Sequence, residues 1–136
     1  MKIVDSIKIE IPSLRENIRI VESFIENAKK RFRISDDIYG NIMVAVTEAV
    51  NNAITHGNKE EEDKNVMLSL FLENDAIRFE VKDEGKGFDY HNLPDPTLPE
   101  NVEKLYGRGV FLMRKLSDEV SFEDNGRLVV LTFYMN

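Results

Sequence analysis

The chain has 136 residues, 42% of them hydrophobic, which is enough for one compact domain with its own core, and we expect a single domain over residues 1–136. Its 25 acidic and 18 basic residues give a net charge of −7, which argues against general nucleic-acid binding and against attraction to an anionic membrane. It has no cysteine, which excludes disulfides, thiolate chemistry and cysteine-ligated metals and fits the reducing cytoplasm.

Targeting and membrane-spanning segments are not expected either. The N-terminus carries acidic residues and lacks the long apolar core of a secretory signal. No apolar run approaches the ~20 residues that a membrane-spanning helix needs. We therefore expect a cytoplasmic protein without a membrane partner.

The first two elements are predicted from the spacing of their apolar residues. Lys2–Ile11 alternates apolar and polar side chains near its end, as a half-buried strand does. Leu14–Phe32 carries a narrow apolar stripe at helical spacing. Ile20 and Phe24 lie off that stripe, so that with neighbouring arginines they could face a partner, although single exposed apolar residues are common.

The stretch Ser35–Gly57 is predicted as one long amphipathic helix, with Ser35 as its N-cap and Gly57 as its stop. At about 100° per residue, Glu48 and Asn52 sit roughly 40° apart on one face that borders the apolar side. A carboxylate and a carboxamide one turn apart form either an ordinary boundary stripe or a half-buried polar shelf. The helix by itself favours the ordinary stripe.

Two strands are predicted next. Residues 58–64 are polar and charged and are expected to form a solvated loop. Apolar residues then alternate over 66–72 and 77–81, with a turn between them. The buried parity of the second strand continues onto Asp83, so that this carboxylate is expected to point inward and to need hydrogen-bond donors nearby.

Two glycine-rich segments follow, separated by a long loop. Gly85 and Gly87 lie in DEGKGFD, residues 83–89, where they break the strand and let the backbone approach another group closely. Residues 90–106 contain three prolines, and a loop of that length is typical of a lid or a binding loop.

Gly107, Arg108 and Gly109 are predicted to lead directly into an apolar helix over residues 110–116. Glycines just before a helix expose backbone N–H groups at the positive end of the helix dipole, which predicts an anion site. The guanidinium of Arg108 suits a phosphate.

A β-hairpin is expected to close the chain, with Asn125-Gly126 as a two-residue turn. The pattern of its second arm leaves two choices for the apolar set on one side. These are Leu128, Val130 and Phe133, or Val129, Leu131 and Tyr134.

Each of these features is weak alone, but their order is specific. In that order the chain resembles the GHKL superfamily, named for gyrase, heat-shock chaperone, histidine kinase and mismatch-repair ATPases. Within it, the chain is similar to the small anti-sigma factor serine kinases of the RsbW and SpoIIAB type. TEAVNNAITHG (47–57) resembles their N box, DEGKGFD their first glycine box and GRGVFLMRKLSDEV (107–120) their second.

The resemblance implies a fold, a two-layer α/β (α+β) sandwich in which a mixed, mostly antiparallel sheet packs on helices. ATP would lie between the central helix, the Asp83 loop and the lid. One position departs from the family pattern, which commonly has Gly-Thr in the last hairpin, since here Gly126 is followed by Arg127.

The resemblance also implies roles for the motif residues. Asn52 would bind Mg²⁺ through its side-chain oxygen. Glu48 would be the catalytic base for the attacking hydroxyl, and Asp83 would accept a hydrogen bond from the adenine amino group. His56 is either a phosphate neighbour or part of a helix-end cap. The remaining cofactor-binding residues would admit the base or contact the phosphates: Gly85, Gly87, Gly107, Arg108 and Gly109.

The implied function is transfer of the γ-phosphoryl group of ATP to a serine or threonine of an antagonist, anti-anti-sigma protein, by a homodimer that also sequesters a sigma factor or a similar regulator. One alternative is a sequestering module with nucleotide as a structural cofactor, against which the retained Glu48 argues. Another is a detached domain of a histidine-kinase-like system. The only histidines, His56 and His91, lie in the N box and the loop, which argues against it.

Overall fold

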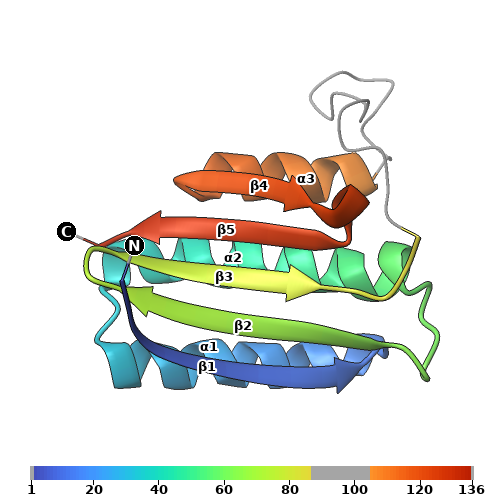
Figure 1. Ribbon diagram of the computed structural model, residues 1–136, viewed down its shortest axis with the longest axis horizontal. Helices are drawn as coiled ribbons and strands as arrows, with labels where there is room; N and C mark the ends of the chain where they lie inside the picture. Colours follow the sequence, from blue (N-terminus) through green and yellow to red (C-terminus); the bar gives the residue numbers. More distant parts are fainter. Residues whose placement is uncertain (1, 87–104, 136) are drawn as a thin grey trace.

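Helices cover one face of a five-stranded β-sheet in the computed structural model, which describes residues 2–86 and 105–135 (Figure 1). The strand order is β1-β2-β3-β5-β4, and all four neighbouring pairs are antiparallel. The two-layer α/β sandwich is confirmed, and over the described residues its sheet is wholly antiparallel rather than mixed. The strands are β1 (Ile3–Pro12), β2 (Asn65–Glu73), β3 (Ala76–Lys82), β4 (Glu119–Glu123) and β5 (Leu128–Tyr134).

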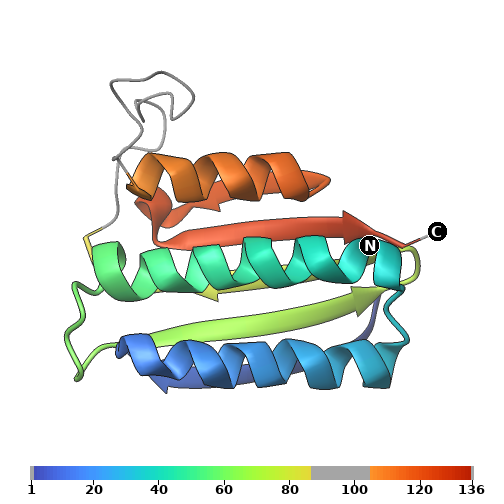
Figure 2. The same cartoon turned by 180° about the vertical axis from the view of Figure 1, so that it is seen from behind.

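Within the part of the chain that the structure describes, three α-helices form the second layer and lie side by side along the sheet (Figure 2). The first is shorter than predicted because residues 15–17 form a separate 3-10 turn. Among residues 2–86 and 105–135, no helix is long and apolar enough to cross a membrane. The helices are α1 (Ile18–Phe32), α2 (Asp36–Asn52) and α3 (Leu105–Leu116).

The two apolar residues that lie off the stripe of α1 differ in their surroundings. Ile20 is 47% exposed, whereas Phe24 is partly buried against the core. The nearby Arg15 forms an ion pair with Glu60, with 2.9 Å between Nε and Oε1. Of the two apolar residues that could face a partner, Ile20 is therefore exposed and Phe24 is half-buried.

The core lies between α2 and the middle of the sheet. Ile42, Val46 and Val50 of α2 are fully buried. On β3 and β5, the rings of Phe79 and Phe133 meet edge to face with their centres 6.0 Å apart. Burying one such side chain contributes about 1.5–3 kcal/mol. This packing holds α2 on the sheet and thereby places the polar residues at its C-terminal end.

The end of the central helix differs from the prediction. The α-helix stops at Asn52, and Ala53–Gly57 forms a π-helical turn. The N–H of Asn58 donates to the carbonyl of Ala53, five residues back, at 2.8 Å. A π-turn adds a residue to the helical circuit and is frequent at functional sites. Ser35 is at the N-cap position, but its side chain makes no capping hydrogen bond.

The last hairpin is also closed differently from the prediction. Glu123 of β4 pairs with Leu128 of β5, so that four residues connect the strands instead of two. Asp124, Asn125 and Gly126 all have positive φ, at 52°, 56° and 87°. Neither apolar set predicted for the second arm is complete, because the side chains buried on β5 are those of Val129, Leu131 and Phe133.

Candidate functional site

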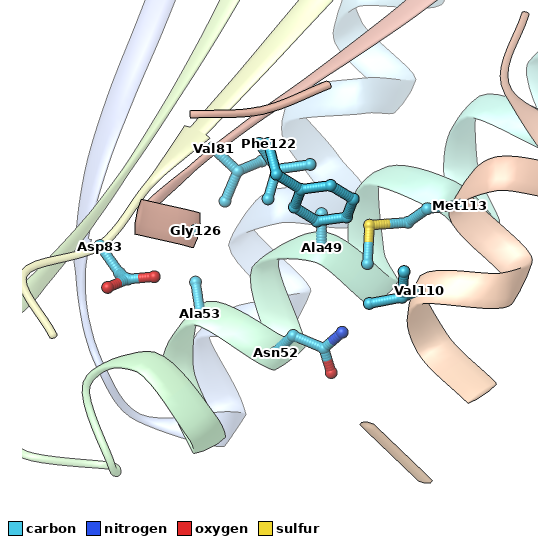
Figure 3. Close-up of a pocket in the computed structure, with 10 residues that line it drawn as sticks. Ala49, Asn52, Ala53, Val81, Asp83, Val110, Met113, Phe122 and Gly126 are labelled. Carbon is cyan, nitrogen blue, oxygen red and sulfur yellow. The ribbon is translucent and has the colours of Figure 1, made fainter. Parts of the chain in front are cut away.

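A pocket opens between α2, α3 and the ends of the central strands (Figure 3). Its walls are mostly apolar, and the polar side chains in it are those of Asn52 and Asp83. An apolar pocket with a few polar groups suits a small ligand with an apolar or aromatic part. The lining residues are Ala49, Asn52, Ala53, Val81, Asp83, Val110, Met113, Phe122, Gly126 and Val129.

Asp83 lies just beyond β3, where the alternation of that strand turns its carboxylate inward as predicted, and it is 8% exposed. Burial raises the pKa of this carboxyl. The N–H of Gly85 and the positive charge of Arg127 oppose that rise, whereas the charge of Asp124 adds to it. The Gly85 N–H donates to Oδ1 at 2.8 Å. Because a carboxylate offers about four acceptor positions, one such bond leaves capacity for a donor in the pocket.

Two glycines make room for this carboxylate. A Cβ atom at Gly57 would lie 2.5 Å from both Cγ and Oδ2 of Asp83. A Cβ atom at Gly85 would lie 1.9 Å from the carbonyl oxygen of Gly57. Gly57 was predicted as a helix stop, and the π-turn does end there. Glycine at this position also allows the close approach of Asp83. The close approach predicted at Gly85 is found, and its neighbour is the π-turn.

A second polar group lies where α3 crosses α2. A Cβ atom at Gly109 would lie 2.8 Å from Nδ2 of Asn52 and 3.1 Å from Oε2 of Glu48. The structure thus brings Glu48, Asn52 and Gly109 together, although they come from different motifs. Asn52 is 8% exposed, and its Nδ2 is buried without a hydrogen-bond partner. A buried donor without a partner costs about 1–3 kcal/mol, so a ligand that accepts a hydrogen bond from this Nδ2 would recover that cost.

The second glycine motif lies differently from the prediction. Gly107, Arg108 and Gly109 were predicted to precede a helix, but α3 begins at Leu105 and includes all three. The predicted start of this helix at residue 110 is therefore wrong, whereas the anion site itself stays a prediction. Gly107 remains in the first turn, where N–H groups have no carbonyl partner within the helix. Gly109 instead allows close packing against α2.

Some predicted site residues lie elsewhere. Gly87 and most of the predicted lid over residues 90–106 fall outside the described residues. His56 lies in the π-turn, and it is not among the residues that line the pocket. Burial, and then the charge of Arg15, lower the pKa of this imidazole.

Sequence reasoning missed two residues beside the pocket. Asn58 was assigned to a solvated loop, which is wrong, because it is fully buried. No periodic signal could have shown this, since Asn58 follows a π-turn. Arg127 was noticed only as a departure from a family pattern. Its Nε–H donates to the carbonyl of Gly85 at 2.8 Å.

The described residues offer limited ligands for a metal. Among residues 2–86 and 105–135 there is no cluster of three or more histidine, cysteine or acidic side chains that could hold an ion. Mg²⁺, however, is commonly bound by one or two protein oxygens together with phosphate oxygens and water. The side-chain oxygen of Asn52 could supply one such ligand, whereas its Nδ2, which is buried without a partner, is a donor that suits a phosphate oxygen and not a cation.

The chain is similar to several known proteins. Residues 11–133 match the family described as the histidine kinase-like ATPase domain. The chain is 31% identical to the serine-protein kinase RsbW of Bacillus velezensis over 98% of its own length and 88% of the relative. It is 30% identical to the protein of the same name from Bacillus subtilis, over 97% and 87%.

A solved structure shares the fold. The crystal structure of the RsbU and RsbW domains of a Mycobacterium tuberculosis protein superposes with a TM-score of 0.63 at 16% identity. The match covers 98% of this chain and 32% of that one.

Proposed function

The chain belongs to the family of histidine kinase-like ATPase domains, and on that premise we propose that it is an ATP-dependent protein serine/threonine kinase of the anti-sigma-factor type. The observation that carries the proposal is that the Asp83 carboxylate and the Asn52 amide line the same apolar pocket. That arrangement has an acceptor for a base at one end and a polar cluster for phosphates at the other.

Asp83 would bind the base. Adenine presents an exocyclic amino group, which is a donor, and the carboxylate retains acceptor positions beyond its bond to Gly85. Val81, Phe122 and Val129 provide apolar surface on which a purine ring would lie. Guanine carries an oxygen at the equivalent position, which would face the carboxylate acceptor to acceptor. The site would therefore prefer adenine nucleotides.

Asn52 and Glu48 would serve the phosphate end. Asn52 would contribute its side-chain oxygen to Mg²⁺, an ion that, when bound, neutralises negative charge on the phosphates. Gly107 and Arg108, in the first turn of α3, would offer N–H groups and a positive charge to the same phosphates.

The chemical step is an in-line phosphoryl transfer. The oxygen of a serine or threonine hydroxyl on the partner forms a bond to the γ-phosphorus, the bond from that phosphorus to the bridging oxygen breaks, and ADP leaves. Glu48 takes the proton of the attacking hydroxyl. Its Oε2 would lie 3.1 Å from a Cβ atom at Gly109, which puts the base next to the second glycine motif.

The partners are part of the proposal. The serine-protein kinases that the chain matches support a protein substrate. The resemblance adds an anti-anti-sigma protein as phosphoacceptor, and a sigma factor or other regulator of transcription as the sequestered partner, with the kinase as a homodimer. A kinase with these partners would act in the cytoplasm, where ATP and the transcription machinery are found.

The test is phosphorylation of a purified anti-anti-sigma protein, followed by intact-protein mass spectrometry. With Mg²⁺-ATP the wild type should add one phosphoryl group to the acceptor. Glu48→Gln should lose that transfer and keep nucleotide and partner binding, whereas Glu62→Gln, a change in an exposed loop acid, should retain all three. If the wild type binds the acceptor but transfers no phosphate to any acceptor tested, the sequestering module replaces the kinase.

A further inference from the structure

The backbone that carries Asp83 is held from two sides by residues outside the recognised motifs. Three successive N–H groups, those of residues 83, 84 and 85, each have a defined acceptor. The Asp83 N–H donates to the carbonyl of Arg127 at 2.9 Å. The Glu84 N–H donates to Oδ1 of Asn58 at 2.8 Å, and the Gly85 N–H donates to the Asp83 carboxylate itself.

Asn58 holds the loop from the side of α2. Its Oδ1 accepts from Glu84, while its Nδ2 donates to Oγ of Ser13 at 2.8 Å and to the carbonyl of Asn65 at 3.0 Å. Its own N–H closes the π-turn onto Ala53. One fully buried amide therefore ties the end of the central helix, the end of β1 and the start of β2 to the residue after Asp83.

Arg127 holds the loop from the side of the last hairpin. Its Nε–H donates to the Gly85 carbonyl at 2.8 Å. Its Nη1 donates to the carbonyl of Asp124 at 3.0 Å and contacts the carboxylate of the same residue at 3.2 Å. The guanidinium is thus fixed at both ends, between the left-handed turn that closes the hairpin and the loop beside the pocket.

We propose that Asn58 and Arg127 are positioning residues that set the aim of the Asp83 carboxylate and thereby the preference for a 6-aminopurine over a 6-oxopurine. The inference rests on the proposed binding of nucleotide in this pocket. The distance between the Asp83 carboxylate and the apolar walls of the pocket is set by a loop of a few residues, so releasing either hold moves the acceptor. A misplaced carboxylate forms a weaker hydrogen bond with the amino group of a 6-aminopurine and repels the oxygen of a 6-oxopurine less. The affinities for the two purines therefore become more similar.

The readout is the ratio of the dissociation constants of IDP and ADP, measured by isothermal titration on the full chain. The wild type should bind ADP more tightly. Arg127→Met and Asn58→Ala should each lower the ratio by about three- to tenfold, the effect of one or two lost hydrogen bonds. Asp83→Asn, which removes the carboxylate, should abolish the preference for ADP and shows the lowest ratio to be expected. A general loss of folded protein weakens both nucleotides equally and leaves the ratio unchanged.

Two variants control for structural damage. Ser13→Ala removes a buried partner of Asn58 without touching residues 83–85, so that it should lower thermal stability and leave the ratio unchanged. Arg31→Met makes the same substitution as Arg127→Met, but at an exposed ion pair with Asp5. It should change neither the thermal stability nor the ratio of dissociation constants. If Asn58→Ala does not fold, Arg127→Met decides the question alone.

A second measurement does not depend on nucleotide. In the protein without ligand, the amide hydrogens of Asp83, Glu84 and Gly85 should exchange slowly, and Arg127→Met should speed the exchange of Gly85 and its neighbours without affecting β3. Wild-type selectivity and exchange that persist unchanged in both variants overturn the inference. A wild type that binds neither ADP nor IDP overturns the proposed function. Fast exchange of the amide hydrogens at residues 83–85 in that protein also overturns the positioning role of Asn58 and Arg127.

Discussion

The two ends of the pocket are built differently. At the base end, every backbone N–H from residue 83 to residue 85 has an acceptor, and two glycines let the π-turn and the loop pack together. At the phosphate end, the buried Nδ2 of Asn52 has no partner. We infer that the base end is formed before nucleotide binds, whereas the phosphate end is completed by it. Substitutions at the base end should therefore mainly affect folding, and substitutions at the phosphate end should mainly affect phosphate binding.

The largest effect is expected at Gly85. A Cβ atom there would lie 1.9 Å from a backbone carbonyl that cannot move alone, so Gly85→Ala should destabilise the protein by about 3 kcal/mol or more and abolish nucleotide binding. Gly40 in α2 is the matched control, because a Cβ atom there meets nothing within 4 Å. Gly40→Ala should therefore raise the free energy of unfolding, by at most about 1 kcal/mol. Denaturant unfolding measures both. Equal stability of the two variants would contradict the packing at the base end.

Asn52→Leu should separate folding from phosphate binding. Removing the amide that lacks a partner should stabilise the ligand-free protein by about 1 kcal/mol, since the leucine has no polar group to desolvate. The same change should weaken Mg²⁺-ATP binding at least about tenfold and leave adenosine binding nearly unchanged. A variant that loses stability and adenosine affinity together would show that Asn52 belongs to the base end.

Gly109→Ala should also weaken ATP binding without weakening adenosine binding, but by less than Asn52→Leu. The new methyl group would press on Asn52 and Glu48, whose side chains must shift, while alanine favours the helix by up to about 1 kcal/mol. Stability should thus change little. The affinity for ATP should fall several-fold and that for adenosine should not, as measured by titration calorimetry. An unchanged ATP affinity would mean that the positions of the Asn52 and Glu48 side chains do not govern phosphate binding.

The smallest predicted effect is on the pH dependence of folding. Burial raises the pKa of Asp83 in the folded state above its ordinary value. Between the two values the folded protein holds a proton that the unfolded chain has released, so stability falls as the pH rises through that window and stays lower above it. Asp83→Asn should therefore make the ligand-free protein slightly more stable at pH 7 and remove this part of the pH dependence. If Asp83→Asn were less stable than the wild type at pH 7, the claim that burying the Asp83 carboxylate destabilises the folded protein would be wrong.

The sequence predicted the features that follow from a regular period. Strand alternation placed Asp83 at the pocket, and helical spacing put Glu48 and Asn52 on one face beside the core. Both depend only on local geometry. Features that break the period were missed, namely the π-turn after Asn52, the start of α3 at Leu105 and the four-residue turn before Leu128.

Burial of single polar residues was equally beyond the sequence. Asn58 stands in a charged stretch, and it is buried because the π-turn directs it between β1, β2 and the Asp83 loop. Arg127 carries a charge that suits a surface, but the loop beside it offers a carbonyl acceptor. Such contacts between distant segments depend on the assembled fold, and no local pattern encodes them.

The most direct test of the central claim, that Asp83 closes an adenine pocket, is thermal unfolding with and without Mg²⁺-ATP on the wild type and Asp83→Asn. Nucleotide at about 100 times its dissociation constant should stabilise the wild type by about 2.7 kcal/mol, which raises the unfolding midpoint by several degrees. Asp83→Asn should show no such rise although it folds. Equal rises in both proteins, or none in the wild type at millimolar nucleotide, would contradict the claim.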